Sequence, residues 1–403
     1  NSMTVRVSKP EFNLREKITE LDKPSGIKGN ELLRSETTQE ARGLIGSGRK
    51  NLIINGNMQI AQRGTSTTTM GYLIDRFSTA AANINTTTYA QVDVASGTEP
   101  YAAGFRKAAK ITGGDNAVHS NDVLKFNQGI EAQNIARSGW DHKSSSSFIT
   151  LSFWVKSSVG QTFFGRLQTV DGTDQNYAFS YDVSANTWTK VVKTIPGNPN
   201  ITIDDNVGEG LDIEWTLFRG TDTTSSATVV NKWQAYSSGG RLPDGVHSTW
   251  HDTNAATWEI TGVQLEVGKN ATEFEHRPYT EELTLCERYY EVHWQNHNPN
   301  NPAGAHNDGY NAISAGGISG TKAYFPFKYR TQKRANPTLQ YSGKFRISPL
   351  GYTNAEPDEF YSPSIDGGRL RFPQSGGSNK DGVWLEFDGA NSTNGYLAIV
   401  AEL

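Results

Sequence analysis

The segment Phe148–Lys156 reads FITLSFWVK and carries the clearest structural signal in the chain. Every second position in it is apolar, and most of the positions between are polar. The apolar positions are Ile149, Leu151, Phe153 and Val155, and the polar ones are Thr150, Ser152 and Lys156. This alternation is typical of a β-strand with one buried and one solvated face, as in antiparallel sheets. The segment therefore predicts an antiparallel β-sheet.

Two further segments alternate in the same way. In residues 211–217 the odd positions are apolar and the even ones are polar. In residues 258–267 the alternation changes parity at Gly262, which predicts a β-bulge because a bulge adds one residue to one strand. With turn-rich spacers between the strands, residues 51–280 are expected to form a two-sheet β-sandwich of the jelly-roll type. The expected core includes Phe153, Val155, Ile213, Trp215, Leu217, Val263 and Leu265.

The composition also indicates a folded, β-rich chain. Aromatic residues make up 10% of the 403 positions, with nine tryptophans, which excludes a disordered chain. The net charge is −4 and there is no long basic run, so a nucleic-acid partner is not expected. No stretch approaches the roughly 20 apolar residues of a membrane-spanning helix. Cys286 is the single cysteine, so no disulfide can form within one chain.

The first 50 residues differ from the rest. Leu14, Ile18 and Leu21 follow one another at helical spacing, which predicts a short N-terminal helical stem or linker over residues 1–50. A short isolated helix is marginal in water. Either this segment is a frayed linker, or identical chains pool their apolar stripes in a short helical stem.

The last third, residues 281–403, is expected to be a short helix followed by a small C-terminal β tip domain. Thr280 is the predicted N-cap of the helix, and Leu285, Tyr289 and Val292 share its apolar face. Asn-, Pro- and Gly-rich sequence follows over residues 296–320. Alternating patterns then return in Thr321–Tyr329, Lys344–Ile347, Val383–Phe387 and Tyr396–Leu403. Trp384 lies on one of these strands and is assigned to the core.

Several separated motifs resemble a family of phage tail-fibre and virion proteins, notably of marine and cyanobacterial phages. The leading motif is GLIGSGRKNLIINGNMQIAQR at residues 43–63, followed by GYLIDRF at residues 71–77. The closing motif is WEITGVQLEVGKNATEFEHRPYTEELTLCERYY at residues 258–290. Between them, SFWVKSS at 152–158 and TWTKVVKTIP at 187–196 are similar to inner strands of the family. The resemblance covers roughly Leu32 to Tyr290.

The resemblance implies a jelly roll similar to carbohydrate-binding modules, within a homotrimeric receptor-binding fibre of the virion. The N-terminus would join other phage tail proteins, and the variable tip would attach the virion to a host-surface glycan such as lipopolysaccharide. No membrane insertion is expected. Within the motifs, Asp75-Arg76-Phe77 is interpreted as structural support, with an ion pair beside two aromatic rings. Arg277-Pro278 is interpreted as a clamp at the end of the domain.

The tip is rich in the residue types that bind sugars. A sugar presents C–H faces and hydroxyl groups, so its site needs aromatic rings beside polar donors and acceptors. Such residues tend to lie on loops held by a rigid scaffold. The candidate glycan-binding residues are His293, Trp294, Gln295, Asn296, His297, Asn307, Asp308, Tyr310, Asn311, Tyr352, Asn354 and Tyr361.

Catalysis and metal binding have weaker support. No glycosidase motif, nucleophile elbow, P-loop or dinucleotide fingerprint occurs, so the protein is not expected to be an enzyme. A surface-polysaccharide depolymerase and a purely structural virion adaptor stay open as alternatives. His247 and His251 beside Asp252 are interpreted as surface loop histidines, and a metal site at His293, His297 and His306 is weighed as an alternative to hydrogen bonding. No cofactor is expected, although the acidic turns around Asp171 and Asp204–Asp212 are compatible with a structural calcium.

Overall fold

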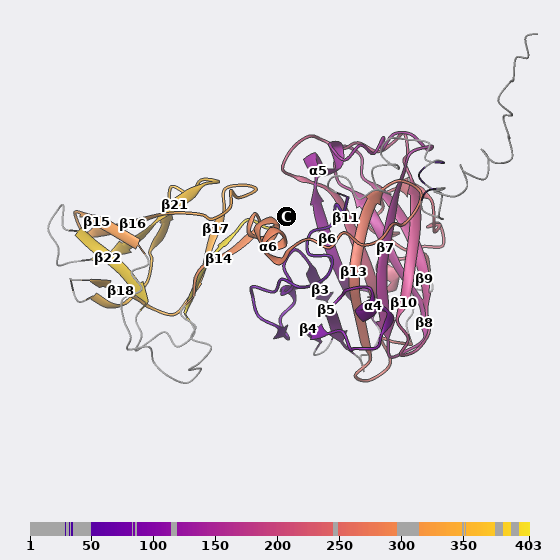
Figure 1. Cartoon of the computed structure of the whole chain (residues 1–403), viewed down its shortest axis with the longest axis horizontal. Helices are drawn as coiled ribbons and strands as arrows, with labels where there is room; N and C mark the ends of the chain where they lie inside the picture. The colour runs from indigo at the N-terminus through magenta and orange to yellow at the C-terminus, as the bar shows by residue number, and fades with distance from the viewer. Residues whose placement is uncertain are drawn as a thin grey trace, which may run out of the picture.

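A computed structural model describes residues 50–82, 84, 87–113, 119–244, 249–295, 314–348, 350, 352–374, 382–387 and 395–403, together with Gly29, Leu32 and Arg34. Figure 1 shows two β-rich bodies, a sandwich and a tip, with helix α6 (Tyr279–Glu287) and the C-terminus between them. The apolar stripe predicted at Leu14, Ile18 and Leu21 lies outside the described residues. None of the helices in the described part is long and apolar enough to cross a membrane.

The sandwich consists of two antiparallel sheets, as the sequence predicts. In order, the six-stranded sheet comprises β1 (Ser66–Thr67), β4 (Thr88–Asp93), β5 (Lys107–Thr112), β13 (Thr257–Val267), β7 (Phe148–Ser157) and β10 (Thr189–Pro196). The seven-stranded sheet comprises β12 (Trp233–Ala235), β9 (Gln175–Val183), β8 (Gln161–Thr169), β11 (Glu209–Arg219), β6 (Val123–Glu131), β3 (Ser78–Ala82) and β2 (Gly71–Tyr72). Short helices α4 (Glu99–Ala102), α5 (Ala132–Ala136) and η1 (Thr221–Thr223) lie in the connections. The predicted mainly β fold is therefore confirmed.

The apolar positions that the alternation assigns to the core lie between the two sheets, but the polar positions of β7 and β11, such as Thr150, Ser152 and Glu214, are buried as well and not solvated as expected. All seven predicted core residues are buried, with an exposed fraction of 1% or less. Trp215 lies at the centre, with its ring 5.6 Å from that of Phe153 and 6.0 Å from that of Phe126. Aromatic contacts at such distances add to the free energy gained from burial.

The predicted bulge at Gly262 is also present. The pairing of β13 with β7 shifts register between Thr261 and Gln264, and Gly262 has φ +64°. A β-carbon at this position would lie 2.6 Å from the ring of Phe105. Both the backbone conformation and the close approach of that ring therefore favour glycine.

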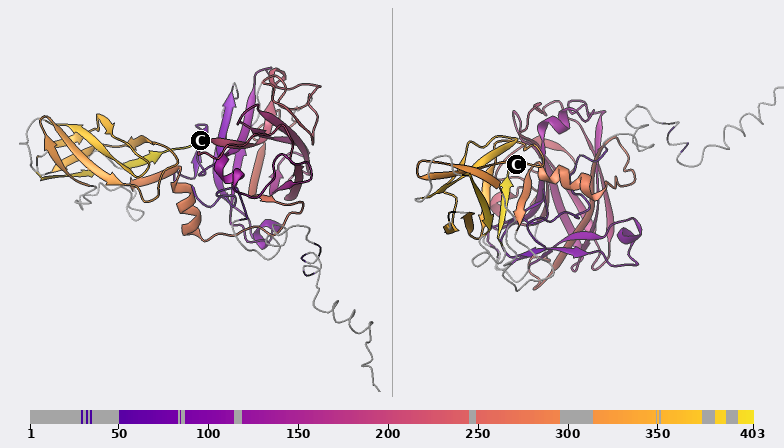
Figure 2. Two further views of the ribbon diagram at one scale, coloured as in Figure 1. Left: turned by 90° about the horizontal axis from the view of Figure 1, so that it is seen from above. Right: turned by 60° about the vertical axis from the view of Figure 1, so that its left-hand side comes forward.

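The tip contains two sheets. In order, the three-stranded sheet comprises β14 (Tyr290–Gln295), β23 (Tyr396–Val400) and β17 (Thr338–Ser342). The seven-stranded sheet comprises β19 (Tyr352–Ala355), β18 (Phe345–Ser348), β22 (Gly382–Phe387), β15 (Ser314–Ser319), β16 (Lys322–Lys328), β21 (Gly367–Pro373) and β20 (Glu359–Tyr361). Figure 2 shows these strands gathered on the far side of α6 from the sandwich. Each of the four strand patterns predicted in the tip coincides with an observed strand.

The predicted helix is shorter than expected and begins earlier. Its N-cap is Pro278 rather than Thr280, and the helix ends at Glu287. Val292 consequently lies in β14, where it pairs with Ala398 of β23, instead of on the helix face. The reason is tertiary: β23 returns from the end of the chain and offers a pairing partner that local spacing cannot reveal.

The last residues of the chain join the tip to the sandwich. The carboxylate of Glu402 contacts Arg63 Nη2 at 3.0 Å and Arg76 Nη1 at 2.5 Å. Arg76 is fully buried, and its guanidinium lies 3.5 Å from the centre of the Tyr289 ring. The hydroxyl of Tyr72 donates to the carbonyl of Leu403 at 3.0 Å. We call this arrangement, with Glu402 between the two arginines, the joint.

The joint corrects one detail of the predicted support motif. The ion-pair partner of Arg76 is Glu402, at the far end of the chain, while Asp75 accepts hydrogen bonds from Gln62. A contact between residues this far apart in sequence leaves no local signal. Arg277 has the predicted clamp geometry, since it donates to the carbonyl of Ile53 at 3.1 Å and contacts Glu275 at 2.7 Å.

Candidate functional site

Many of the candidate glycan-binding residues fall outside the described ranges. Asn296, His297, Asn307, Asp308, Tyr310 and Asn311 lie outside the described residues. For Trp294 and Gln295 in β14, and for Tyr352 in β19, the structure describes the backbone and not the side chain. His293, Asn354 and Tyr361 are described in full.

His293 is tied into the packing of the tip. Its Nδ1 lies 2.5 Å from Oε1 of Glu291, and its ring centre lies 5.0 Å from that of Phe327. Lys333 contacts the other oxygen of Glu291 at 2.6 Å. Burial opposes the charge on Glu291, but the hydrogen bonds from His293 and Lys333 hold the pKa of Glu291 at about 2. His293 and Glu291 thus belong to one charged cluster beside Phe327.

Asn354 and Tyr361 both lie at the surface of the tip. Asn354, in β19, is exposed and has φ +58°, a left-handed conformation that asparagine tolerates better than most residues. Tyr361, in β20, is 36% exposed. The Tyr361 ring packs edge-on against Tyr324, with 5.8 Å between the ring centres. The guanidinium of Arg369 lies 5.1 Å from the centre of the Tyr361 ring.

Trp384 is on the outside of the same sheet, contrary to the predicted core position. It is 37% exposed, whereas its neighbours Val383 and Leu385 are buried. The reason is strand alternation, because odd positions of β22 point inward and Trp384 is at an even position. The sequence Gly382-Val383-Trp384-Leu385 contains this signal, and assigning the bulky ring to the core overlooks it.

The outer side of the seven-stranded sheet of the tip carries a surface that we call the aromatic face. Its rings are Tyr324, Tyr361 and Trp384, and the small residues between them are Ala315, Gly317 and Gly382. A β-carbon added to Gly317 or to Gly382 would meet no described atom within 4 Å. The surface between the rings is therefore open in the described part of the tip. The indole nitrogen of Trp384 donates to Glu386, which fixes the orientation of that ring.

Charged side chains are paired along the edge of the aromatic face. Arg371 contacts Asp358 at 3.0 Å and also pairs with Glu359, and Lys322 pairs with Asp358. These pairs are half-exposed, so each contributes little to stability. They place hydrogen-bonding groups next to Tyr324 without leaving a strong net charge. Rings beside polar groups are the combination that a sugar requires.

The sandwich has its own buried ionic cluster on the seven-stranded sheet. Glu214 contacts Arg166 at 2.9 Å and Arg219 at 2.7 Å, and all three side chains are buried. Despite burial, the two guanidinium groups hold the pKa of Glu214 well below its usual range. Nearby, burial and the charge of Asp212 raise the pKa of Glu209 to about 7. Glu214 therefore stays ionised and paired with the two arginines, while Glu209 titrates near neutral pH.

The other predicted polar clusters can be placed in part. Backbone N–H of Asp204 donates to Asp171 at 2.9 Å, which brings the two acidic turns together. Within the described ranges, no group of three or more His, Cys, Asp or Glu side chains could hold a metal ion. His247 lies outside those ranges. His251 is buried with its ring centre 3.8 Å from that of Phe218, so it is not a surface histidine; stacking on an aromatic ring accounts for its burial.

Comparisons with known proteins gave matches to solved structures only. The sequence matches no described protein family, and it matches no curated protein. The structure is similar to a family 16 carbohydrate-binding module, with 12% identity, a TM-score of 0.25, and coverage of 53% of this chain and 99% of that one. It is also similar to a family 11 carbohydrate-binding module from Clostridium thermocellum, with 10% identity, a TM-score of 0.24, and coverage of 53% and 97%.

A cyclase from Fischerella sp. TAU is similar to a comparable degree. Its identity is 10% and its TM-score 0.32, with coverage of 56% of this chain and 100% of the cyclase. These likenesses span about half of this chain. At such low TM-scores these likenesses do not indicate a ligand or an activity for this chain.

Proposed function

We propose that this protein is the receptor-binding protein of a phage tail fibre, and that it attaches the virion to a host-surface glycan through the aromatic face of the tip. The observation that supports the glycan contact most is the exposure of Tyr361 and Trp384 on one open sheet face. Aromatic rings that share one exposed face, with polar groups at their edge, form a surface that a partner can cover. A sugar ring does so by placing its C–H face on the indole.

The virion role is supported by the resemblance of residues 43–63, 71–77 and 258–290 to tail-fibre and virion proteins. In that role, three copies of the chain would associate through residues 1–50, which would also join the fibre to other tail proteins. Three copies of a weak site acting together would multiply the affinity for a repetitive surface. We propose no cofactor and no catalytic step for attachment.

Binding to bacterial surface polysaccharides tests the proposal. The full chain is applied to a printed panel of lipopolysaccharides and capsular polysaccharides, beside Trp384→Ala, Tyr361→Ala and the control Tyr279→Ala. Tyr279 is 58% exposed at the start of α6, away from the aromatic face. We expect binding to at least one polysaccharide, a loss of at least tenfold in both face variants, and no change in the control. Equal binding by all four proteins would place the contact elsewhere.

Point variants suit this test better than removal of the tip. Deleting residues 281–403 would remove Glu402 and leave Arg63 and Arg76 of the sandwich without their carboxylate partner. A truncated protein could then lose binding because its sandwich is destabilised. Trp384 and Tyr361 are surface residues, so their replacement leaves the core intact.

Depolymerisation of the glycan is the second candidate, and one observation favours it. Sugar cleavage needs a carboxylic acid that is protonated near neutral pH beside a second carboxylate. Glu209, whose pKa is about 7, has Asp212 as a charged neighbour. If the protein cleaves, new reducing ends will appear when it is incubated with the bound polysaccharide, and Glu209→Gln will abolish them. Attachment without cleavage predicts no reducing ends with either protein.

A further inference from the structure

We infer that the aromatic face binds an extended, largely uncharged glycan chain that lies across the strands, so that several consecutive sugar units make the contact rather than one terminal sugar. This inference rests on the proposed function and specifies its ligand.

The strand register places all three rings on one face. Residues directly opposite each other on neighbouring antiparallel strands point to the same side of a sheet. Trp384 of β22 is opposite Ala315 of β15, and Gly317 of β15 is opposite Tyr324 of β16. Further along the sheet, Tyr324 is opposite Arg371, and Arg369 is opposite Tyr361. Since residues two apart on a strand share a side, the series runs unbroken from Trp384 to Tyr361.

The rings form two separate platforms. Tyr324 and Tyr361 touch each other edge-on and form one of them. Trp384 forms the other, and the strand β15 lies between β22 and β16. Trp384 and Tyr324 are two strand spacings apart, or about 10 Å, and also two residues apart along the strands, or about 7 Å. Four strand spacings, or about 19 Å, separate Trp384 from Tyr361. A single sugar ring is similar in width to one aromatic ring, so it can stack on one platform but not on both.

The surface between the platforms lets a chain lie flat. It is made by Ala315, Gly317 and Gly382 together with the exposed Pro326, and added β-carbons at both glycines would meet no described atom within 4 Å. A polymer that stacks one unit on Trp384 and a later unit on the tyrosines would pass over this open strip. A branched or terminal sugar would use one platform and leave the other exposed.

The surrounding side chains favour a glycan over a protein partner. The aliphatic residues of these strands, such as Ile318, Leu370 and Val383, are buried on the inner face. On the outer face, the described strand positions carry no Val, Leu, Ile, Met or Phe. The centre of a protein interface is packed with contiguous apolar groups, whereas this face alternates rings with small and charged residues. The cations Lys322 and Arg371 are paired with Asp358, and the exposed guanidinium of Arg369 lies over the Tyr361 ring, where it can donate to hydroxyl groups. Recognition by hydroxyl groups therefore fits better than recognition by charge.

Oligosaccharides of graded length test the inference. Isothermal titration of the full chain uses five series of one to six units: malto-, cello-, xylo-, manno- and chito-oligosaccharides. We expect at least one series in which Kd falls at least tenfold between one and four units and then levels off. Trp384→Ala should remove this gain, and so should Gly317→Gln, which places a side chain on the strip at a position where the added β-carbon meets no described atom within 4 Å. The control Tyr279→Ala should retain it.

Two results would overturn the inference and leave the proposed function intact. One is equal Kd for one and for four units in a series that binds. The other is a gain with length that survives in Gly317→Gln. Binding to none of the five series also contradicts the inference, and the lipopolysaccharide panel then decides separately whether the tip binds a surface glycan. Thermal unfolding of each variant confirms that the strand positions tolerate the change.

Discussion

Replacing Glu402 should destabilise the protein more than any other single change at the end of the chain. Glu402 is the carboxylate between Arg63 and Arg76, and its side chain is 8% exposed. In Glu402→Ala, the fully buried guanidinium of Arg76 keeps the carbonyl of Gly129 at 2.6 Å and the Tyr289 ring. Its charge, however, loses the neutralising partner. Breaking a buried ion pair in this way typically costs about 3–5 kcal/mol.

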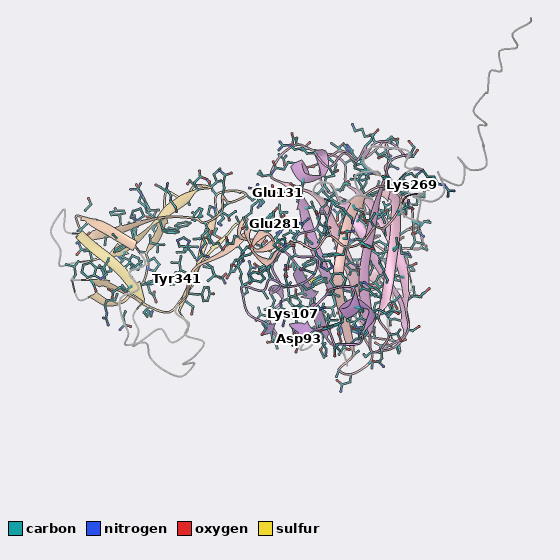
Figure 3. All side chains as sticks on the ribbon, viewed as in Figure 1. Asp93, Lys107, Glu131, Lys269, Glu281 and Tyr341 are labelled. Atoms are coloured by element: carbon teal, nitrogen blue, oxygen red, sulfur yellow. The ribbon has the colours of Figure 1, made fainter. Side chains whose placement is uncertain are left out.

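For Glu402→Ala we expect the free energy of unfolding to fall by about 3 kcal/mol, at the lower end of this range, because Arg76 retains two other contacts. Glu402→Gln keeps the shape and one hydrogen-bond acceptor, so its loss should be smaller. A matched control is Asp93→Ala, which breaks the pair with Lys107 at 2.6 Å at the edge of the sandwich (Figure 3). Asp93 is 81% exposed, so this change should cost under about 1 kcal/mol.

Urea unfolding followed by tryptophan fluorescence measures these losses. Seven of the nine tryptophans lie in residues 51–280, so the signal reports mainly on the sandwich. Glu402 is in the tail of the chain beyond the tip, and its loss should nevertheless appear in that signal, because its partners Arg63 and Arg76 are in the sandwich. The reasoning fails if Glu402→Ala unfolds within about 1 kcal/mol of the wild type, or if Asp93→Ala is equally damaging.

The sandwich and the predicted stem give three more expected outcomes. Trp215→Ala should cost roughly 3–5 kcal/mol in urea unfolding, since Trp215 is fully buried among aromatic rings; a cost under about 1 kcal/mol would contradict its central place in the core. The raised pKa of Glu209 favours folding fully below about pH 4.5, and this contribution is lost as pH rises through about 7. Between about pH 4 and 8 the free energy of unfolding should therefore fall by about 1–3 kcal/mol less in Glu209→Gln than in the wild type. An equal fall in the two proteins would refute this. Light scattering at micromolar concentration should give three times the 44.2 kDa chain mass, and a single-chain mass would rule out the trimer.

The fold of the sandwich could be predicted because apolar residues recur at every second position of its strands. Phe153, Trp215 and Val263 occupy the inward positions that period two assigns to them, and all are buried. Gly262 could be predicted as a bulge because the apolar side of a strand changes parity only where one extra residue is inserted. These features depend on local sequence, so the sequence alone is sufficient to find them.

The joint and the aromatic face depend on contacts between distant segments. Glu402 meets Arg76 only after β23 has returned to pair with β14, and nothing near either residue in the sequence indicates this contact. Tyr361 is predicted as a glycan contact and does lie exposed on the tip, whereas Trp384 is assigned to the core by its bulk and points outward. Gly317 and Gly382 belong to the aromatic face because the strand register places them beside Tyr324 and Trp384. Cross-strand register is a tertiary property, and single-sequence patterns do not determine it.

A crystal structure of the full chain with the tightest-binding oligosaccharide is the most direct test of the glycan contact. We predict consecutive sugar rings over Ala315 and Gly317, with one ring stacked on Trp384 and a later one on the pair Tyr324 and Tyr361. Sugar density on the sandwich, with the aromatic face of the tip left bare, would contradict this prediction.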